Sequence, residues 1–233
     1  MKIVVFCDSI KRIPQFRSRF AGDGQSKNTL LFVVCNNARH GRLRFVASQL
    51  WHGLRYRLGD WFDLAHDLLK DHLCLGFDPL GSPKTLAYLE RHQPDLALHA
   101  MGVIYREHLI RRCGLGILNA HIGKLPKYRG RSVMEWSILC GDVTGVTVFF
   151  IDAGIDTGPK IVLWVSVPVD GFRSLDEAKH HLFSKDVEFY HKAVEKIQEG
   201  APFEYNDVTQ GLRFYEMSAL FRAELKSHFE RAR

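Results

Sequence analysis

Short apolar runs that alternate with helix-like segments constrain the fold of this chain more than any other feature of the sequence. Ile3–Cys7 and Thr29–Cys35 are runs of this kind, rich in aliphatic side chains. Both are too short for buried helices, so we predict that they are buried parallel strands. The segment between them carries Phe16 and Phe20 on one helical face and ends at Gly22-Asp23-Gly24. This order predicts a strand–helix–strand unit.

The same alternation continues along the rest of the chain. Further strands are predicted at 96–101, 116–120, 146–152 and 161–168, and a short one near 213–217. Helices are predicted at 82–92, 133–140 and 174–198 and after residue 217, while 42–73 has a helix-like but irregular pattern. Strands that alternate with helices predict an α/β fold, with a mostly parallel central sheet flanked by helices. In such sheets, ligands bind beyond the carboxyl ends of the strands.

Two of the predicted helices carry clear signals at their ends. Ser82 is the predicted N-cap of the first of them, and Pro83 occupies its first helical position. Ser174 caps the helix over 174–198, and Gly200 ends it. Side chains at helical spacing form the predicted buried stripe of this second helix: Leu182, Phe183, Val187, Tyr190, Val194 and Ile197.

We expect one domain over residues 1–200, because no repeat or low-complexity linker divides this part of the chain. Residues 201–233 are predicted to form a short C-terminal extension made of a strand and a helix. Its apolar side chains either cover the core of the domain or contact a second copy of the chain in a homodimer. These side chains are Leu212, Phe214, Tyr215, Leu220 and Phe221.

The composition is that of an ordinary folded protein, with 233 residues, 46% of them hydrophobic and 25% charged. The formal net charge of +6 is compatible with nucleic acid, anionic lipid or phosphorylated substrates. The positive residues are nevertheless scattered, with only short runs such as Lys11-Arg12 and Arg111-Arg112. We therefore favour a solvated surface over a nucleic-acid interface.

Neither the five cysteines nor the twelve histidines show the spacing of metal ligands, so we expect no metal. Several cysteines fall in apolar segments, where a cysteine usually acts as a small buried hydrophobe, and this fits a reducing cytosol. No apolar run is long enough to span a bilayer, and Met1-Lys2-Ile3 leads directly into a predicted strand rather than a signal peptide. We expect a cytoplasmic protein without a membrane partner.

The polar side chains of Asn119 and His121 lie at the end of the strand predicted over 116–120. Their positions, i and i+2, point to the same side of an extended backbone. An asparagine amide can donate to a developing oxyanion, and a histidine can donate or transfer a proton. Asp156 lies in a turn rich in Gly, Thr and Pro between two predicted strands, where its carboxylate can orient the imidazole and stabilise its protonated form.

These three side chains suit acyl transfer through a tetrahedral intermediate, with no need for a serine or cysteine nucleophile. Ordinary structural roles stay open from this pattern alone, because Asn and Asp also form turns and most single histidines are structural. Three ordered motifs make the pattern specific. They are the run from Asn119 to Gly130, which contains Leu125-Pro126, then Gly145-Val146-Thr147, and then Gly154-Ile155-Asp156-Thr157-Gly158.

Together, these motifs strongly resemble the folate-dependent formyltransferase family, which includes glycinamide ribonucleotide, methionyl-tRNA and sugar-nucleotide N-formyltransferases. The resemblance covers residues 95–168 most clearly. It implies a Rossmann-like formyltransferase fold, a transferase of one-carbon groups and 10-formyltetrahydrofolate as the formyl donor. It also implies that Asn119 and His121 stabilise the oxyanion, while Asp156 helps to manage protons around it. The acceptor amine must arrive neutral, because an ammonium ion has no lone pair for the attack.

The resemblance also implies two walls of a folate pocket and a set of substrate contacts. One wall is the loop whose backbone binds the pterin ring, made of Met101, Gly102, Val103 and Ile104. The other wall is the turn over 152–156, with Asp152, Gly154 and Ile155. The loop before Gly130 supplies the implied substrate contacts Lys127, Tyr128 and Arg129.

Two departures from the family pattern bear on the acceptor. Glycinamide ribonucleotide enzymes carry a glycine-rich phosphate loop after the first strand, where this chain reads Cys7-Asp8-Ser9-Ile10-Lys11-Arg12. This argues against the purine-pathway role, although Lys11 and Arg12 remain either phosphate contacts or, as we favour, exposed helix charges. Methionyl-tRNA enzymes add a C-terminal barrel, and about 35 residues follow the helix over 174–198. We therefore favour a small-molecule acceptor over a nucleic-acid acceptor.

The run from Tyr128 to Trp136 is most similar to formyltransferases that act on nucleotide-linked amino sugars. Such a sugar is the expected acceptor, and Trp136, Phe149 and Phe150 either stack on it or pack in the core. Alternatives are a methionyl-tRNA-type enzyme that lacks the C-terminal domain, a 10-formyltetrahydrofolate hydrolase that uses water, and a non-catalytic binding relative. The intact trio argues against the last of these.

Overall fold

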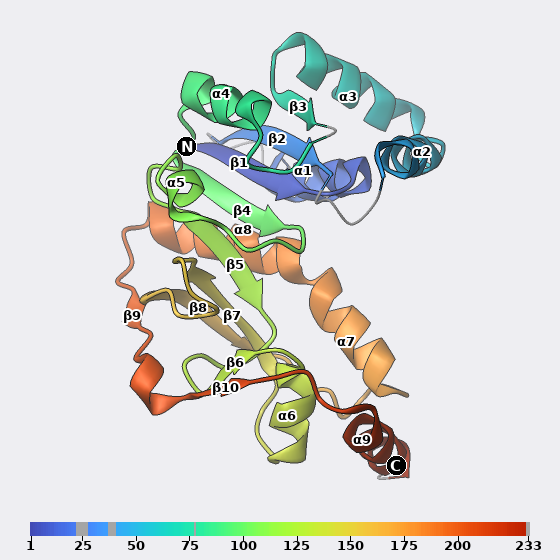
Figure 1. Cartoon of the computed structure of the whole chain (residues 1–233), viewed down its shortest axis with the longest axis vertical. Coiled ribbons are helices and arrows are strands. Elements are labelled where there is room, and N and C mark those ends of the chain that lie inside the picture. Colours follow the sequence, from blue (N-terminus) through green and yellow to red (C-terminus); the bar gives the residue numbers. More distant parts are fainter. Residues whose placement is uncertain (22–27, 37–40, 77, 232–233) are drawn as a thin grey trace. The chain divides into compact units, whose positions relative to one another are not determined.

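A computed structural model describes residues 1–21, 28–36, 41–76 and 78–231. The predicted turn at Gly22-Asp23-Gly24 and the last two residues of the predicted C-terminal extension lie outside the described residues. Two compact units make up the chain, Met1–Leu118 and Asn119–Arg233 (Figure 1). The predicted division into a domain over 1–200 and an extension over 201–233 stays a prediction.

The first unit is built on parallel strands in the order β3-β2-β1-β4-β5. Side chains from Ile3 to Cys7 are fully buried in the central strand, and this confirms that the first apolar runs are buried parallel strands. The strands are β1 (Lys2–Cys7), β2 (Thr29–Cys35), β3 (Leu73–Gly76), β4 (Leu96–Ala100) and β5 (Ile117–His121), which continues into the second unit.

Helices connect consecutive strands of this unit, as the parallel direction of the strands requires. At the start of α4, the Ser82 hydroxyl accepts a hydrogen bond from the Thr85 backbone nitrogen, and Pro83 follows the cap as predicted. Residues 42–73, which have an irregular helix-like pattern in the sequence, form two helices and the start of β3. The helical elements are η1 (Ile10–Arg12), α1 (Ile13–Ala21), α2 (Arg42–Gly53), α3 (Leu58–Leu69), α4 (Pro83–His92) and α5 (Glu107–Ile110).

The second unit has strands in the order β5-β7-β8-β9, with β7–β8 and β8–β9 antiparallel, and a separate parallel pair of β6 and β10. Helix α8 packs on β7 and β8 (Figure 1). The strands are β6 (Tyr128–Gly130), β7 (Gly145–Phe150), β8 (Lys160–Ser166), β9 (Glu204–Tyr205) and β10 (Leu212–Phe214). The helical elements are α6 (Val133–Leu139), α7 (Leu175–Ser184), α8 (Asp186–Gln198), η2 (Val208–Gln210) and α9 (Ala219–Arg231). The α/β fold with a mostly parallel sheet is as predicted.

The long helix predicted over 174–198 is wrong in one respect, because the structure divides it at Lys185 into α7 and α8. Its cap is as predicted, since the Ser174 hydroxyl accepts from the Glu177 backbone nitrogen at 3.1 Å. Phe183, which was predicted to be buried, is 54% exposed. Leu182 is 1% exposed and faces the core, and because adjacent helical residues point about 100° apart, the side chain of Phe183 turns away from it.

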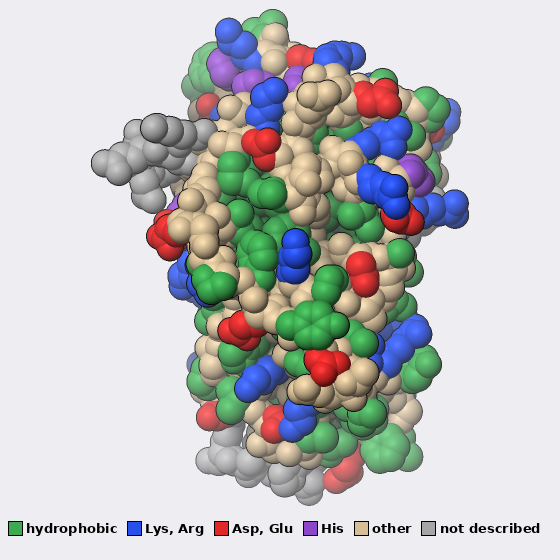
Figure 2. Space-filling model, turned by 90° about the vertical axis from the view of Figure 1, so that its left-hand side faces the viewer, with side chains coloured by type: hydrophobic (Ala, Val, Ile, Leu, Met, Phe, Trp, Pro, Cys, Tyr) green, Lys and Arg blue, Asp and Glu red, His purple; other side chains and the backbone are tan. Residues whose placement is uncertain are grey.

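Charged side chains are mixed on the face drawn in Figure 2, where Lys and Arg alternate with Asp and Glu. On the described residues of this face, positive charge does not gather into one large patch. Among the helices of the described residues, none has both the length and the apolar character that spanning a bilayer requires.

Four of the five cysteines, at 7, 35, 74 and 113, are buried free thiols, whereas Cys140 is exposed. Burial raises the pKa of Cys35 and of Cys113 to about 12, and it raises the pKa of Cys7 and Cys74 as well. Because the thiolate is the reactive form, these four groups should be inert near neutral pH.

We expect a colorimetric disulfide reagent to modify one thiol, that of Cys140, rapidly in the folded protein and all five thiols after unfolding. Cys140→Ser should remove the rapid phase, and a second rapid thiol would contradict this.

Candidate active site

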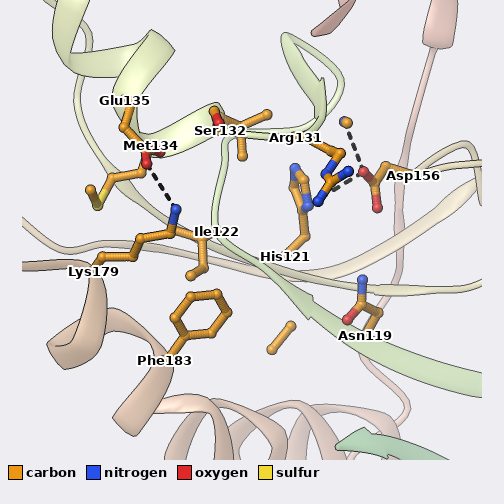
Figure 3. Close-up of a pocket in the computed structure, with 13 residues that line it drawn as sticks. Asn119, His121, Ile122, Arg131, Ser132, Met134, Glu135, Asp156, Lys179 and Phe183 are labelled. Atoms are coloured by element: carbon orange, nitrogen blue, oxygen red, sulfur yellow. Dashed lines mark hydrogen bonds and ion pairs between the residues drawn. The ribbon is translucent and has the colours of Figure 1, made fainter. Parts of the chain in front are cut away.

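The end of β5 places Asn119 and His121 on the wall of one cavity of about 330 Å³ in the second unit (Figure 3). Asp156 lines the same cavity from the turn between β7 and β8. The structure therefore brings the predicted trio of Asn119, His121 and Asp156 together in one cavity. His121 is buried, with 7% of its surface exposed, so its ring has a fixed environment.

Both ring nitrogens of His121 face acceptors. The Nε2 atom lies 2.8 Å from the backbone oxygen of Tyr128, and Nδ1 lies 3.5 Å from Oδ2 of Asp156. A carbonyl oxygen only accepts, so Nε2 carries the hydrogen and donates it. Nδ1 then carries a proton only in the imidazolium form. Since 3.5 Å is longer than a normal N–H···O bond of about 2.9 Å, Nδ1 is not committed to Asp156 and is available to a substrate oxygen.

Asp156 lies in a turn with left-handed backbone, at φ +53°. Its Oδ2 atom accepts a hydrogen bond from the Gly130 backbone nitrogen at 2.9 Å. Close approach of the turn to β7 requires glycine at 158, because a Cβ there would lie 1.7 Å from the Phe150 backbone oxygen. Backbone geometry thus holds the carboxylate beside the imidazole.

The loop that precedes β6 is fastened to β7 by a buried threonine. The Thr147 hydroxyl donates to the Gly123 backbone oxygen at 2.6 Å and accepts from the Leu125 backbone nitrogen at 3.2 Å. The peptide bond between Leu125 and Pro126 is cis. These contacts explain why the Gly145-Val146-Thr147 motif accompanies the Leu125-Pro126 motif in the sequence.

The three implied substrate contacts point to protein groups in this structure. Lys127 forms an ion pair with Asp142 at 2.6 Å, and the Tyr128 hydroxyl donates to the same carboxylate. Burial and that hydrogen bond raise the pKa of Tyr128, so its hydroxyl stays protonated. Arg129 donates to the backbone oxygens of Val208 and Gly211. Their contact with a substrate remains a prediction.

Asp142 is expected to stabilise this loop in a pH-dependent way. Hydrogen bonds from Lys127 and Tyr128 lower the pKa of Asp142 below its ordinary value of 3.8. A carboxyl with a lowered pKa stabilises the fold fully above its unfolded pKa and loses that contribution as pH falls through the folded pKa. The urea midpoint of Asp142→Asn should therefore lie below that of the parent at pH 6, and the difference should shrink below pH 4. A difference independent of pH would contradict this role.

Several cavity residues were missed by the sequence analysis as site residues. Glu135 is buried and forms an ion pair with Lys179 at 2.8 Å, and Phe183 lies one helical turn beyond Lys179 (Figure 3). Ser132 and Arg131 complete this side of the cavity. The i, i+4 spacing of Lys179 and Phe183 was visible, but it does not say which strand end their helix faces.

The predicted folate walls fall in different units. Residues 101–104 follow β4 in the first unit, where Met101 is buried and Ile104 is 75% exposed. Asp152, Gly154 and Ile155 belong to the turn of Asp156 in the second unit, and Asp152 Oδ1 accepts from the Gly154 backbone nitrogen at 3.0 Å. Their contact with folate stays a prediction. Among the described residues, no group of three or more His, Cys, Asp or Glu side chains is arranged to hold a metal ion.

Comparison with protein families gives a direct match. A family model described as Formyl transferase matches residues 77–194, about half of the chain. A methionyl-tRNA formyltransferase of Pelobacter propionicus is 32% identical over 141 residues, which are 59% of this chain and 42% of the relative. One of Solibacter usitatus is 47% identical over 62 residues, 26% of this chain and 20% of the relative. The chain thus spans less than half the length of these curated relatives.

Solved structures share the fold at lower sequence identity. A sugar N-formyltransferase from Shewanella sp FDAARGOS_354 has a TM-score of 0.61 at 14% identity, covering 92% of this chain and 76% of that one. Glycinamide ribonucleotide transformylase 1 from Symbiobacterium toebii has a TM-score of 0.58 at 22% identity, covering 86% and 88%. A formyltransferase from Anoxybacillus kamchatkensis, in complex with UDP-4,6-dideoxy-4-formamido-L-AltNAc and tetrahydrofolate, has a TM-score of 0.53 at 16% identity, covering 92% and 86%.

Proposed function

Because this chain belongs to the formyl transferase family, we propose that it is an N-formyltransferase that moves the formyl group of 10-formyltetrahydrofolate to a primary amine. The observation that carries the proposal is the shared cavity of Asn119, His121 and Asp156. An amide donor, an imidazole and a carboxylate within one cavity match what acyl transfer to an amine needs. A nucleotide-linked amino sugar is the proposed acceptor.

In the proposed reaction, the neutral amine attacks the formyl carbon and forms a C–N bond, and the carbonyl oxygen becomes an oxyanion. The Asn119 amide and a protonated His121 Nδ1 donate hydrogen bonds to that oxygen. Asp156 accepts the proton that the amine loses and returns it to the folate nitrogen as the old C–N bond breaks. Tetrahydrofolate and the formamide product then leave. His121 suits its part because Tyr128 fixes the ring through Nε2.

Several observations support folate as the donor. The turn over 152–156 carries Asp156 into the cavity wall, so a folate bound against the turn would present its formyl group near the carboxylate. The Anoxybacillus kamchatkensis protein of the same fold was solved with tetrahydrofolate. We propose residues 101–104 as the second folate contact, through their backbone.

Chemistry of the cavity supports a sugar acceptor. A cavity of about 330 Å³ is at the small end of ligand pockets, which span about 300–1,000 Å³, and it suits a small amine-bearing ring. Ser132 and Lys179 offer polar contacts to hydroxyl groups, and Phe183 offers an exposed ring face. Solved structures of the same fold include a sugar N-formyltransferase.

A methionyl-tRNA acceptor is the second candidate, favoured by the sequence identity of 47% over 62 residues to a relative with that name. We also propose a cytoplasmic location, which the four buried free thiols fit.

We propose that two copies of the chain pair through the C-terminal segment, because Leu220 and Phe221 are 80% and 58% exposed.

The acceptor is tested by offering purified protein 10-formyltetrahydrofolate together with nucleotide-linked 3-amino and 4-amino sugars, aminoacylated initiator tRNA, or water alone. Tetrahydrofolate release is followed by absorbance, and formylated product by mass spectrometry. Formylation of a sugar is the expected result. Formylation of the tRNA would replace the sugar by the second candidate, and folate turnover without an acceptor would indicate a hydrolase.

A further inference from the structure

The segment that follows α8 contacts the turn that carries Asp156 and the strand β6, which is hydrogen-bonded to His121 and Asp156. It comprises residues 204–217 and includes β9, η2 and β10. None of its residues lines the cavity, so the segment acts on the site only through other groups. Two sets of contacts, one to the turn of Asp156 and one to β6, carry the inference.

Asn206 fixes the turn that carries Asp156. It is 2% exposed, and its Nδ2 atom donates to the backbone oxygens of Asp156 at 3.3 Å and Gly158 at 3.0 Å. Its backbone nitrogen donates to the Pro159 backbone oxygen at 2.9 Å. Both hydrogens of the amide are used, and a flipped amide would set an oxygen against two carbonyl oxygens. The orientation of Asn206 is therefore determined by the turn.

Asp156 has a backbone conformation that needs such support. Its φ of +53° is uncommon for a residue other than glycine and persists where surrounding contacts hold it. A relaxed backbone at this position would carry the carboxylate away from the Gly130 nitrogen, 2.9 Å from Oδ2, and from His121. Asn206 thus fixes the main chain from which the carboxylate projects.

The second set of contacts pairs β10 with β6 in parallel register. The Leu212 backbone nitrogen donates to the Lys127 backbone oxygen at 3.2 Å, and the Arg131 backbone nitrogen donates to the Phe214 backbone oxygen at 3.0 Å. The ring of Phe214 stacks on that of Tyr128, with centroids 5.2 Å apart. The segment therefore fixes both the backbone and a buried side chain of β6.

Strand β6 is hydrogen-bonded to both His121 and Asp156, the catalytic pair. Its Tyr128 backbone oxygen accepts from His121, and its Gly130 backbone nitrogen donates to Asp156. We propose that residues 204–217 are a positioning clamp for this pair, in which Asn206 sets Asp156 and β10 sets the strand that both side chains contact.

Hydrogen exchange tests the clamp without any substrate. In the full ¹⁵N-labelled chain, Asn206→Ala should speed exchange of the Gly130 amide about 10-fold. Asn206→Asp, which keeps the size of the side chain but removes the amide donor, should speed it by a similar factor. The reference is the amide of Val148 in buried β7, which reports a loss of overall stability. Gln210→Ala removes an exposed amide from the same segment and should change neither rate. An unchanged ratio of Gly130 to Val148 exchange in both Asn206 variants would overturn the proposal.

A second readout rests on the proposed function and uses whichever acceptor of the panel is formylated. Asn206→Ala should lower kcat on the order of 10- to 100-fold and leave the KM for the acceptor unchanged. In an Asp156→Asn background the same change should have little further effect, because Asn206 acts through Asp156. Additive losses would overturn the positioning role. Faster Gly130 exchange in a protein that formylates none of the acceptors would contradict the proposed function alone.

Discussion

Replacing His121 by Asn is expected to lower the turnover number of formyl transfer by about 100-fold or more, while tetrahydrofolate still binds. An asparagine keeps a polar group on the cavity wall but removes the ring that bonds the Tyr128 backbone oxygen through Nε2 and faces Asp156 through Nδ1. It can offer a hydrogen bond, yet it cannot become a cationic donor to the oxyanion. The loss should therefore fall on kcat rather than on the KM for either substrate.

The measurement is steady-state turnover with the acceptor that the parent protein formylates, together with tetrahydrofolate binding by calorimetry. His180→Asn is the matched control, because His180 is exposed on α7 and does not line the cavity. It should retain full turnover. Equal turnover in His121→Asn and the parent would remove His121 from the mechanism. Circular dichroism, recorded before the kinetic measurements, shows whether the variant is still folded at the assay temperature.

Replacing Gly130 by Ala is expected to impair both stability and turnover. Gly130 has φ +103°, and a Cβ there would lie 2.1 Å from the Phe214 backbone oxygen. The backbone strain alone costs about 1–3 kcal/mol of unfolding free energy. The clash must also displace β10 from β6, and the Gly130 nitrogen would then move relative to Asp156. We expect turnover to fall on the order of 100-fold for a shift of about 1 Å.

Gly141→Ala separates the two causes, because Gly141 also has positive φ, at +68°, but nothing lies within 4 Å of its added Cβ. It should lose only the stability that strain costs, about 1–3 kcal/mol in urea unfolding, and keep its turnover. Similar turnover losses in the two variants would show that strain alone, and not the contact between β6 and β10, governs activity. Retained turnover in Gly130→Ala would mean that the catalytic pair tolerates a displaced β6.

Local features of the sequence determined a large part of the fold and the site. Apolar runs such as Ile3–Cys7 became buried strands, because only short, fully apolar segments fit a sheet covered on both faces. Ser82 and Ser174 cap their helices because a hydroxyl before a helix satisfies a free backbone nitrogen. The i, i+2 spacing of Asn119 and His121 likewise places both on one cavity wall.

Only the tertiary structure decided which distant segments meet. The break at Lys185 and the exposure of Phe183 were not visible in the helical period, because that period continues across the break. Nor did the sequence show that Lys179 pairs with buried Glu135 beside the trio, or that Asn206 holds the turn of Asp156. Periodicity and caps report how a residue meets its neighbours in the chain and the solvent. Pairing between residues about 50 positions apart depends on how whole elements pack, and no local pattern records that.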